Sequence, residues 1–112
     1  PVLLEDVLID FPGLTVVGAH MGHPYEALLI QYMLKWPQLH LMTSAYLATY
    51  MDPALVRFMD SSRGRGRVWF ASDHPVIPAT KAIEALGLLA ALELKGATRW
   101  LTSSPTARFL SR

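Results

Sequence analysis

Short apolar runs alternate with amphipathic stretches along this chain of 112 residues. The run TVVGAH at residues 15–20 is almost entirely apolar, as is typical of a strand that is covered on both faces. In the second run, residues 39–46, Leu39 and Leu41 alternate with His40 and Met42, and the third run is VWFASD at residues 68–73. The pattern therefore predicts three strands.

A helical pattern follows each predicted strand. Over residues 25–36 the apolar side chains recur at helical spacing: Leu28, Tyr32 and Trp36, with Leu29 and Met33 beside them. Trp36 precedes a proline, which predicts that the helix ends there. The pair Asp52-Pro53 predicts the start of the next helix, because aspartate caps helices and proline suits the first helical position.

Further helices are expected along the rest of the chain. The second helix presents an apolar stripe of Leu55, Phe58 and Met59. The third contains Ala82, Ile83, Leu86 and Leu89. A short helix is expected over residues 3–11 and a last one from Ser104-Pro105. Strands that start near residues 15, 39 and 68, each followed by a helix, predict an α/β fold with a parallel sheet.

Composition narrows the class of protein. Hydrophobic residues make up 52% of the chain and charged residues only 17%, below the quarter or so of an average soluble domain. The surface is therefore expected to be covered in part by more protein. A net charge of +1 provides no field that attracts nucleic acid or an anionic membrane. The absence of cysteine excludes disulfides and fits a reducing compartment.

No segment of the sequence predicts membrane insertion or secretion. The first ten residues are acidic where a signal peptide is basic, and no apolar run reaches the length of about 18 residues that spans a membrane. The expected location is the cytoplasm.

Polar side chains follow all three predicted strands. His20 ends the first, Thr43-Ser44 the second, and Ser72-Asp73-His74 the third. In parallel α/β folds the carboxyl ends of the strands form one face, and reactive groups gather there. The sequence therefore predicts a functional site at this face.

His20 and Asp73 are the sharpest candidates for catalysis. An imidazole moves protons near neutral pH, and a carboxylate binds a cation or accepts a proton from water. Taken singly, Asp73 as a cap of the following helix or loop and His20 as a satisfied buried histidine are the simpler interpretations. Their equivalent positions at two strand ends favour function.

The other candidates are weaker. His23 forms a His-x-x-His pair with His20, but two ligands do not complete a tetrahedral zinc site, and Gly22-His23-Pro24 is also ordinary turn chemistry. His74 precedes a proline and has the same ambiguity, whereas His40 is expected to be structural. The arginines of the segment SRGRGR are expected to lie in a solvated turn: Arg63, Arg65 and Arg67. No phosphate-binding loop and no nucleophile elbow appears.

The segments DFPGLTVVGAHMGHPY, LHLMTSAY, DPALVRFMDSS and RVWFASDHPVI resemble, in order and spacing, the last third of the amidohydrolase-related metal-dependent hydrolases. This branch of the amidohydrolase superfamily includes aminocarboxymuconate-semialdehyde decarboxylase. The tail LELKGATRWLTSSPTARFL resembles the closing helices of the family. The resemblance covers nearly all of residues 1–112.

The resemblance implies three consecutive βα units, the sixth to eighth, of a (β/α)8 barrel. Asp73 resembles the family's metal-binding aspartate, with zinc as the implied metal, and His20 resembles the acid/base histidine after the sixth strand. Independently of the family's assigned roles, His23, Ser44 and His74 are the expected contacts to a small carbonyl or carboxylate substrate. The implied reaction is hydrolysis or decarboxylation.

The chain also departs from the family pattern. The family's His-x-His pair and the histidine of the fifth strand have no counterpart here, Phe-Gly-Ser-Asp is replaced by Phe-Ala-Ser-Asp, and the final Asn-Ala is replaced by Pro-Thr-Ala. Three strands do not close a barrel. We therefore expect the chain to be inactive alone and to associate with itself or with a missing N-terminal half of the barrel. The alternative is a non-catalytic barrel remnant that acts as an oligomerising module.

Overall fold

The computed structural model describes residues 1–91, with side chains through residue 87. The α-helices are α1 (Val2–Asp10), α2 (Glu26–Lys35), α3 (Pro53–Asp60) and α4 (Ala79–Ala91). The strands are β1 (Val16–Gly18), β2 (Leu39–Met42) and β3 (Val68–Trp69), and two 3-10 helices are η1 (Ala19–Gly22) and η2 (Ala48–Tyr50). The predicted helix from Ser104, the side chain of Leu89 and the tail of residues 92–110 lie outside the described residues.

The three strands form one parallel sheet in the order β1-β2-β3. Val16 lies opposite Leu39, and Leu41 lies opposite Val68. The predicted α/β fold with a parallel sheet is confirmed for the described residues. Each strand is shorter than predicted because the chain turns soon after it: His20 follows β1 and Ala45 follows β2, both with positive φ angles that extended pairing does not permit.

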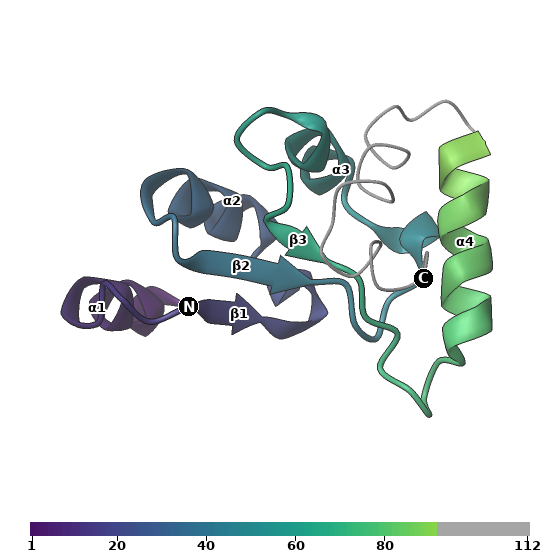
Figure 1. Ribbon diagram of the computed structural model, residues 1–112, viewed down its shortest axis with the longest axis horizontal. Coiled ribbons are helices and arrows are strands. Elements are labelled where there is room, and N and C mark those ends of the chain that lie inside the picture. Colours follow the sequence, from purple (N-terminus) through teal and green to yellow (C-terminus); the bar gives the residue numbers. More distant parts are fainter. Residues whose placement is uncertain (92–112) are drawn as a thin grey trace.

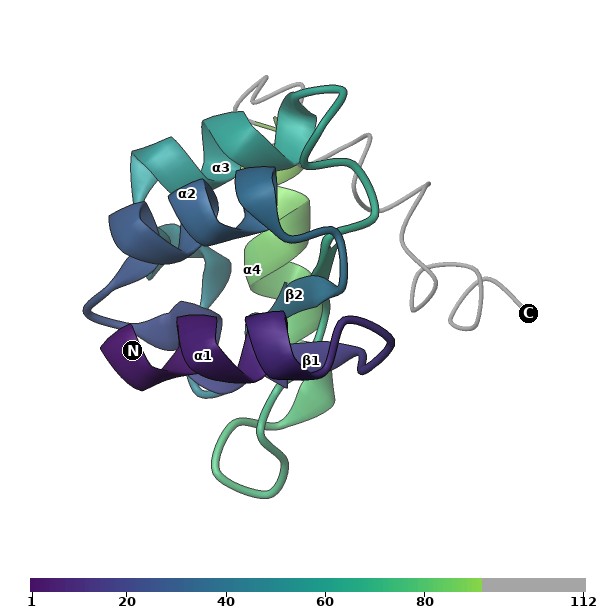
Figure 2. The same cartoon turned by 90° about the vertical axis from the view of Figure 1, so that its left-hand side faces the viewer.

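Helices α2 and α3 cover one face of the sheet (Figures 1 and 2). The inward side chains of β2, Leu39 and Leu41, are fully buried beneath them, as the alternating pattern predicts. Residues Val16–Gly18 of β1 are only half-buried, so the prediction that this strand is covered on both faces is wrong for the described chain. Among the described residues, α2 and α3 cover one face of the sheet, and β1 lies at its edge (Figure 1).

The buried side of α2 differs from the predicted one. Leu29 and Met33 are buried, whereas Tyr32 is only partly buried. Successive residues of a helix turn by about 100°, so a shift of one position rotates the apolar stripe by more than a quarter turn. The predicted end of the helix is confirmed, because α2 stops at Lys35 and Trp36 is extended.

Helix α3 begins as predicted. Asp52 accepts a hydrogen bond from the backbone N–H of Ala54 at 2.6 Å, and Pro53 occupies the first helical position. The predicted stripe of Leu55, Phe58 and Met59 is buried.

Helix α4 stands beyond the carboxyl ends of the strands, against η2 (Figure 1). The predicted helix through Ala82, Ile83 and Leu86 is confirmed. Ala82, Ala85 and Leu86 are buried, whereas Ile83 is 41% exposed.

Arg67 does not lie in a solvated turn, contrary to the prediction for the three arginines. Its guanidinium is partly buried and donates hydrogen bonds to the backbone oxygens of Met33 at 3.2 Å, Trp36 at 2.9 Å and Leu39. Burial lowers the pKa of Arg67, and the charge of Arg63 lowers it further. Arg67 thus satisfies carbonyl groups at the end of α2 and the start of β2, where the helix leaves its last carbonyls unpaired.

Substitution Arg67→Met is expected to lower the free energy of unfolding by about 1–2 kcal/mol, because several carbonyl groups lose a charged donor while water replaces part of the loss. Urea denaturation measures the change. The matched control is Arg65→Met, since Arg65 is exposed and its loss should cost less than about 0.5 kcal/mol. Equal effects of the two substitutions would contradict this role for Arg67.

His40 lies within β2, and its ring packs against that of Trp69 with the centroids 5.0 Å apart. Burial lowers the pKa of His40; a hydrogen bond to the Gln38 carbonyl opposes this shift, and the charge of Arg67 adds to it. The predicted structural role of His40 agrees with this position.

The lowered pKa predicts a loss of stability in mild acid. Below the ordinary histidine pKa of about 6.5, His40 binds a proton in the unfolded chain, whereas in the folded chain it binds one only at a lower pH. The free energy of unfolding should therefore fall as the pH drops through this window. The substitution His40→Phe, which keeps a ring against Trp69, should flatten the fall in urea midpoint between about pH 7 and pH 5. An unchanged pH profile would contradict the prediction.

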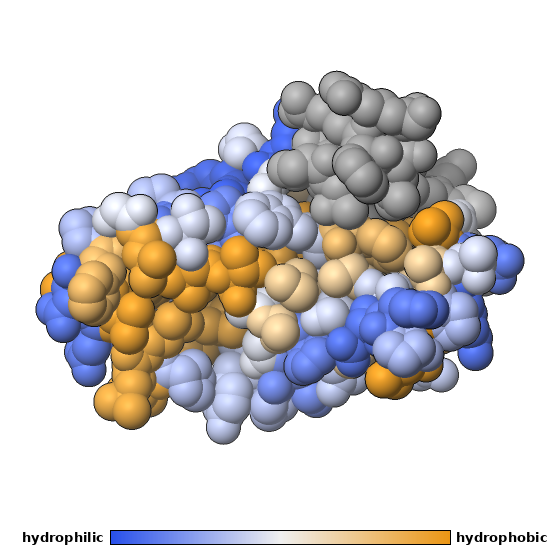
Figure 3. Space-filling view, turned by 60° about the horizontal axis from the view of Figure 1, so that its bottom comes forward, coloured by the Kyte–Doolittle hydropathy of each residue, from blue (hydrophilic) through white to orange (hydrophobic). Residues whose placement is uncertain are grey.

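Apolar side chains remain exposed at the end of the molecule that contains α1. Val2 is 74% exposed, Leu3 78% and Phe11 58%. Figure 3 shows apolar surface gathered over this end. Contiguous exposed apolar patches are typical of surfaces that contact proteins, membranes or ligands.

Candidate functional site

The chain segments that follow β1 and β2 are joined by His20 and Ser44. The backbone N–H of His20 donates to Ser44 Oγ at 3.0 Å, and His20 Nδ1 lies 3.1 Å from the Ser44 carbonyl oxygen and 3.1 Å from its Oγ. The carbonyl oxygen only accepts hydrogen bonds, whereas the Ser44 hydroxyl donates or accepts, so Nδ1 has a partner in either tautomer. Ser44 is buried, whereas His20 is exposed. Two of the candidate residues therefore lie in direct contact.

A second side chain joins the segments that follow β2 and β3. Thr43 Oγ1 donates to the carbonyl oxygen of Ala71 at 3.0 Å and accepts from the N–H of Ala71 at 3.1 Å. The Thr43 hydroxyl thereby pairs with the backbone of Ala71 just beyond the last paired residues of β2 and β3, as a neighbouring strand would. The loop that contains Asp73 starts from this point.

Backbone strain is concentrated at the same face. Four residues other than glycine have positive φ angles in the described chain, and all follow a strand: His20 (54°), Met21 (57°), Ala45 (66°) and Asp73 (66°). Such conformations cost free energy and persist where the surrounding structure imposes them, most often at functional sites. The strain thus marks the face that the sequence pattern predicts.

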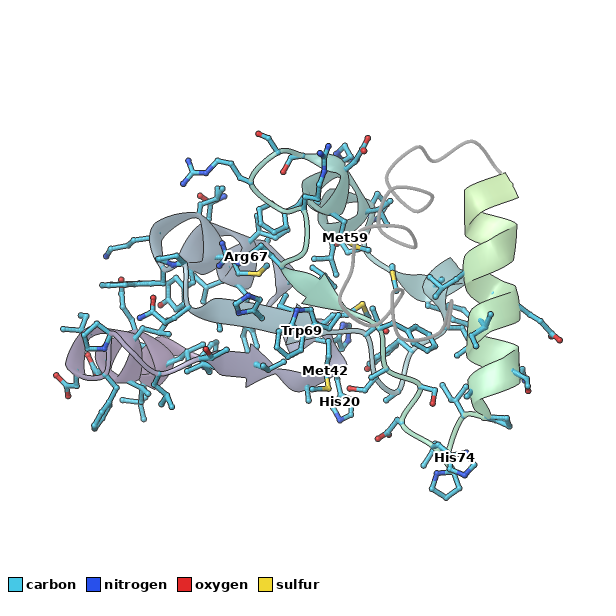
Figure 4. The ribbon with its side chains drawn as sticks, viewed as in Figure 1. His20, Met42, Met59, Arg67, Trp69 and His74 are labelled. Atoms are coloured by element: carbon cyan, nitrogen blue, oxygen red, sulfur yellow. The ribbon has the colours of Figure 1, made fainter. Side chains whose placement is uncertain are left out.

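Asp73 and His74 are both exposed in the loop between β3 and α4. The carbonyl oxygen of Asp73 accepts from the N–H of Val76 at 2.9 Å. Within residues 1–91 its carboxylate makes no hydrogen bond, and α4 begins only at Ala79, so the alternative of a helix cap is not what the structure shows. His20 and Asp73 share no hydrogen bond in this part of the chain. Figure 4 shows His74 at the tip of the loop, away from His20.

The side chain of His23 lies between Glu26 of α2 and Tyr46 of the loop after β2. Its Nδ1 is 2.7 Å from Glu26 Oε1, and its ring centroid is 5.2 Å from that of Tyr46. The side chain of Glu26 is only 10% exposed, while that of His23 is 50% exposed. Sequence reasoning missed Glu26; the available signal was an acidic residue three positions after His23, at a predicted helix start.

The described residues do not by themselves form a metal centre. Among residues 1–91, no group of three histidine, aspartate or glutamate side chains is placed to hold a metal ion. Asp73 and His20 have chemistry that suits a divalent cation, but neither belongs to such a group among the described residues. In the same part of the chain, no helix has both the length and the apolar character needed to cross a membrane.

Comparison with known families decides the class of protein. A family model described as amidohydrolase matches residues 1–105. The chain belongs to the amidohydrolase family. No curated protein and no solved structure matches the chain. Membership indicates chemistry of the metal-dependent hydrolase type, and it agrees with the resemblance that the strand-end motifs suggest.

Proposed function

We propose that this amidohydrolase-family chain provides the acid/base part of a metal-dependent site. The site acts in the cytoplasm on a small carbonyl or carboxylate substrate, by hydrolysis or by decarboxylation as in the decarboxylase-like branch. The observation that supports this most is the cluster of strained residues after all three strands, among them His20 and Asp73. The family match over residues 1–105 supplies the reaction class.

In this proposal His20 transfers the proton. Its Nδ1 is held by the Ser44 carbonyl, which leaves Nε2 as the ring atom that exchanges a proton with the substrate oxygen. A hydrogen-bond partner on one ring nitrogen sets the role of the other. Ser44 is buried, so it acts on the substrate through His20.

Asp73 accepts a proton from the attacking water in this proposal and is the ligand that this chain offers to a divalent metal, with zinc as the metal. Its carboxylate is exposed and has no hydrogen-bonding partner among residues 1–91, so both oxygens are available. The strained φ of 66° fixes the loop that presents it. His23 and His74 are the proposed contacts to the substrate.

The test is an activity assay on the product of the full natural reading frame, supplied with zinc. Small amides, esters, lactones and β-keto acids serve as substrates. We expect turnover of at least one substrate. His20→Gln and Asp73→Asn should each lower the turnover rate by a factor of about 100 or more. Arg65→Gln should leave the rate unchanged. Turnover that survives both substitutions would overturn the proposal.

A second candidate function is self-association. The exposed apolar side chains of α1 and the edge of β1, which has no second strand partner among the described residues, favour it, because unpaired strand edges and apolar patches promote association. We propose a second copy of the chain as the partner.

Light scattering coupled to size exclusion tests this association. The chain should elute as a dimer or larger assembly, and Leu3→Glu should shift it toward the monomer. A stable, soluble monomer of the natural chain would contradict the association.

A further inference from the structure

The pair of His23 and Glu26 does not follow from the sequence motifs. Glu26 is a carboxylate in the first turn of α2, yet its side chain is only 10% exposed. A buried carboxylate is costly unless it is paired, and the partner in the structure is His23 Nδ1 at 2.7 Å. The short distance indicates a charge-assisted hydrogen bond.

The ring of His23 is held from a second direction as well. Tyr46, which lies in the loop after β2, packs against it with the centroids 5.2 Å apart and the planes tilted by 46°. This loop also contains Ser44, the hydrogen-bonding partner of His20. The ring of His23 is therefore held between the start of α2 and the loop after β2, while half of its side chain stays exposed.

The arrangement determines which ring nitrogen is available. A carboxylate accepts hydrogen bonds, so Nδ1 carries a hydrogen toward Glu26. The other nitrogen, Nε2, is then the atom that has a lone pair on the neutral ring. Carboxylates that bind one imidazole nitrogen in this way fix the ring's tautomer and orientation and raise the basicity of the other nitrogen.

We propose that Glu26 is a positioning residue that holds His23 as the Nδ1–H tautomer, so that Nε2 accepts a hydrogen bond from a hydroxyl or N–H group of the substrate. The use of Nε2 rests on the proposed function, whereas the tautomer does not. Glu26 acts only through His23.

The experiment is nitrogen NMR of the full chain labelled with ¹⁵N, recorded without substrate at about pH 9, where imidazole rings are neutral. The two ring nitrogens differ strongly in chemical shift according to which one carries the proton. A His23→Gln variant assigns the signals. The natural chain should show the proton on Nδ1 of His23. Glu26→Leu should return the ring to the Nε2–H form that predominates in free histidine.

Glu26→Gln serves as the conservative variant, because its side-chain oxygen still accepts a hydrogen bond and should retain the Nδ1–H form. An Nε2–H ring in the natural chain would overturn the proposal, even where Glu26→Leu fails to fold. Unchanged signals in a folded Glu26→Leu would also overturn it. Either result leaves the assay of His20 and Asp73 unaffected, so a failure here is distinguishable from a failure of the proposed function.

Discussion

Replacing Gly22 with alanine is expected to lower the free energy of unfolding by about 2–5 kcal/mol. The φ angle of Gly22 is +71°, which an alanine adopts only at a cost, and an added Cβ would lie 1.8 Å from Leu29 Cδ1. Leu29 is buried in the core, so it has little room to move away. Urea denaturation followed by tryptophan fluorescence measures the change.

Two other glycines separate the causes of this effect. Gly66 has a φ of +75° but no atom within 4 Å of an added Cβ, and Gly13 has neither a positive φ nor a neighbour within that distance. Gly66→Ala should therefore show the backbone cost alone, about 1–2 kcal/mol, and Gly13→Ala should be close to neutral. If Gly22→Ala lowered the free energy of unfolding no more than Gly66→Ala does, the predicted clash between the added Cβ and Leu29 would be contradicted.

The position of Gly22 links this stability effect to the site. Gly22 lies between His20 and His23, and its carbonyl oxygen accepts the N–H of Tyr25 just before α2. A shift of this turn would move both histidines relative to Ser44 and Glu26. Gly22→Ala should therefore weaken the NMR signature of the Nδ1–H form of His23 as well as the fold.

The substitution Thr43→Val is expected to cost about 2–3 kcal/mol in the free energy of unfolding. Valine has the shape of threonine but lacks the hydroxyl that both donates to and accepts from Ala71, and each backbone group left without a partner costs about 1–3 kcal/mol. Thermal or urea unfolding measures it. Thr43→Ser keeps the hydroxyl and should retain most of the stability.

Loss of the Thr43 hydroxyl should also affect the loop that contains Asp73. Ala71 begins the loop that leads to Asp73, so Thr43→Val should also loosen that loop, and amide hydrogen exchange of residues 71–76 should speed up. Equal stability of the valine and serine variants would show that the bridge between the segments after β2 and β3 is unimportant.

Much of this fold was predictable from local patterns. The alternation of Leu39 and Leu41 predicted the inward face of β2, and Asp52-Pro53 predicted the start of α3, because both depend on neighbouring residues only. The convergence of His20 and Ser44 followed from the general rule that parallel strands end at one face.

The remaining features depend on tertiary contacts that no local pattern contains. Arg67 looked like a turn residue, but the carbonyls that it binds lie 28 to 34 positions earlier in the chain. The orientation of α2 is set by the sheet beneath it, and the early end of β1 is set by the strained turn at His20. The pairing of Glu26 with His23 is a local contact, three positions apart, that the sequence motifs did not predict.

A calorimetric titration of the chain with zinc tests the proposed metal site. We propose Asp73 as the ligand that this chain offers, and residues 1–91 bring no three ligands together. We therefore expect weak binding, in the high micromolar range or weaker, that Asp73→Asn removes and Arg65→Gln does not. Tight binding of one zinc ion per chain, or weak binding that persists in Asp73→Asn, would contradict this proposal.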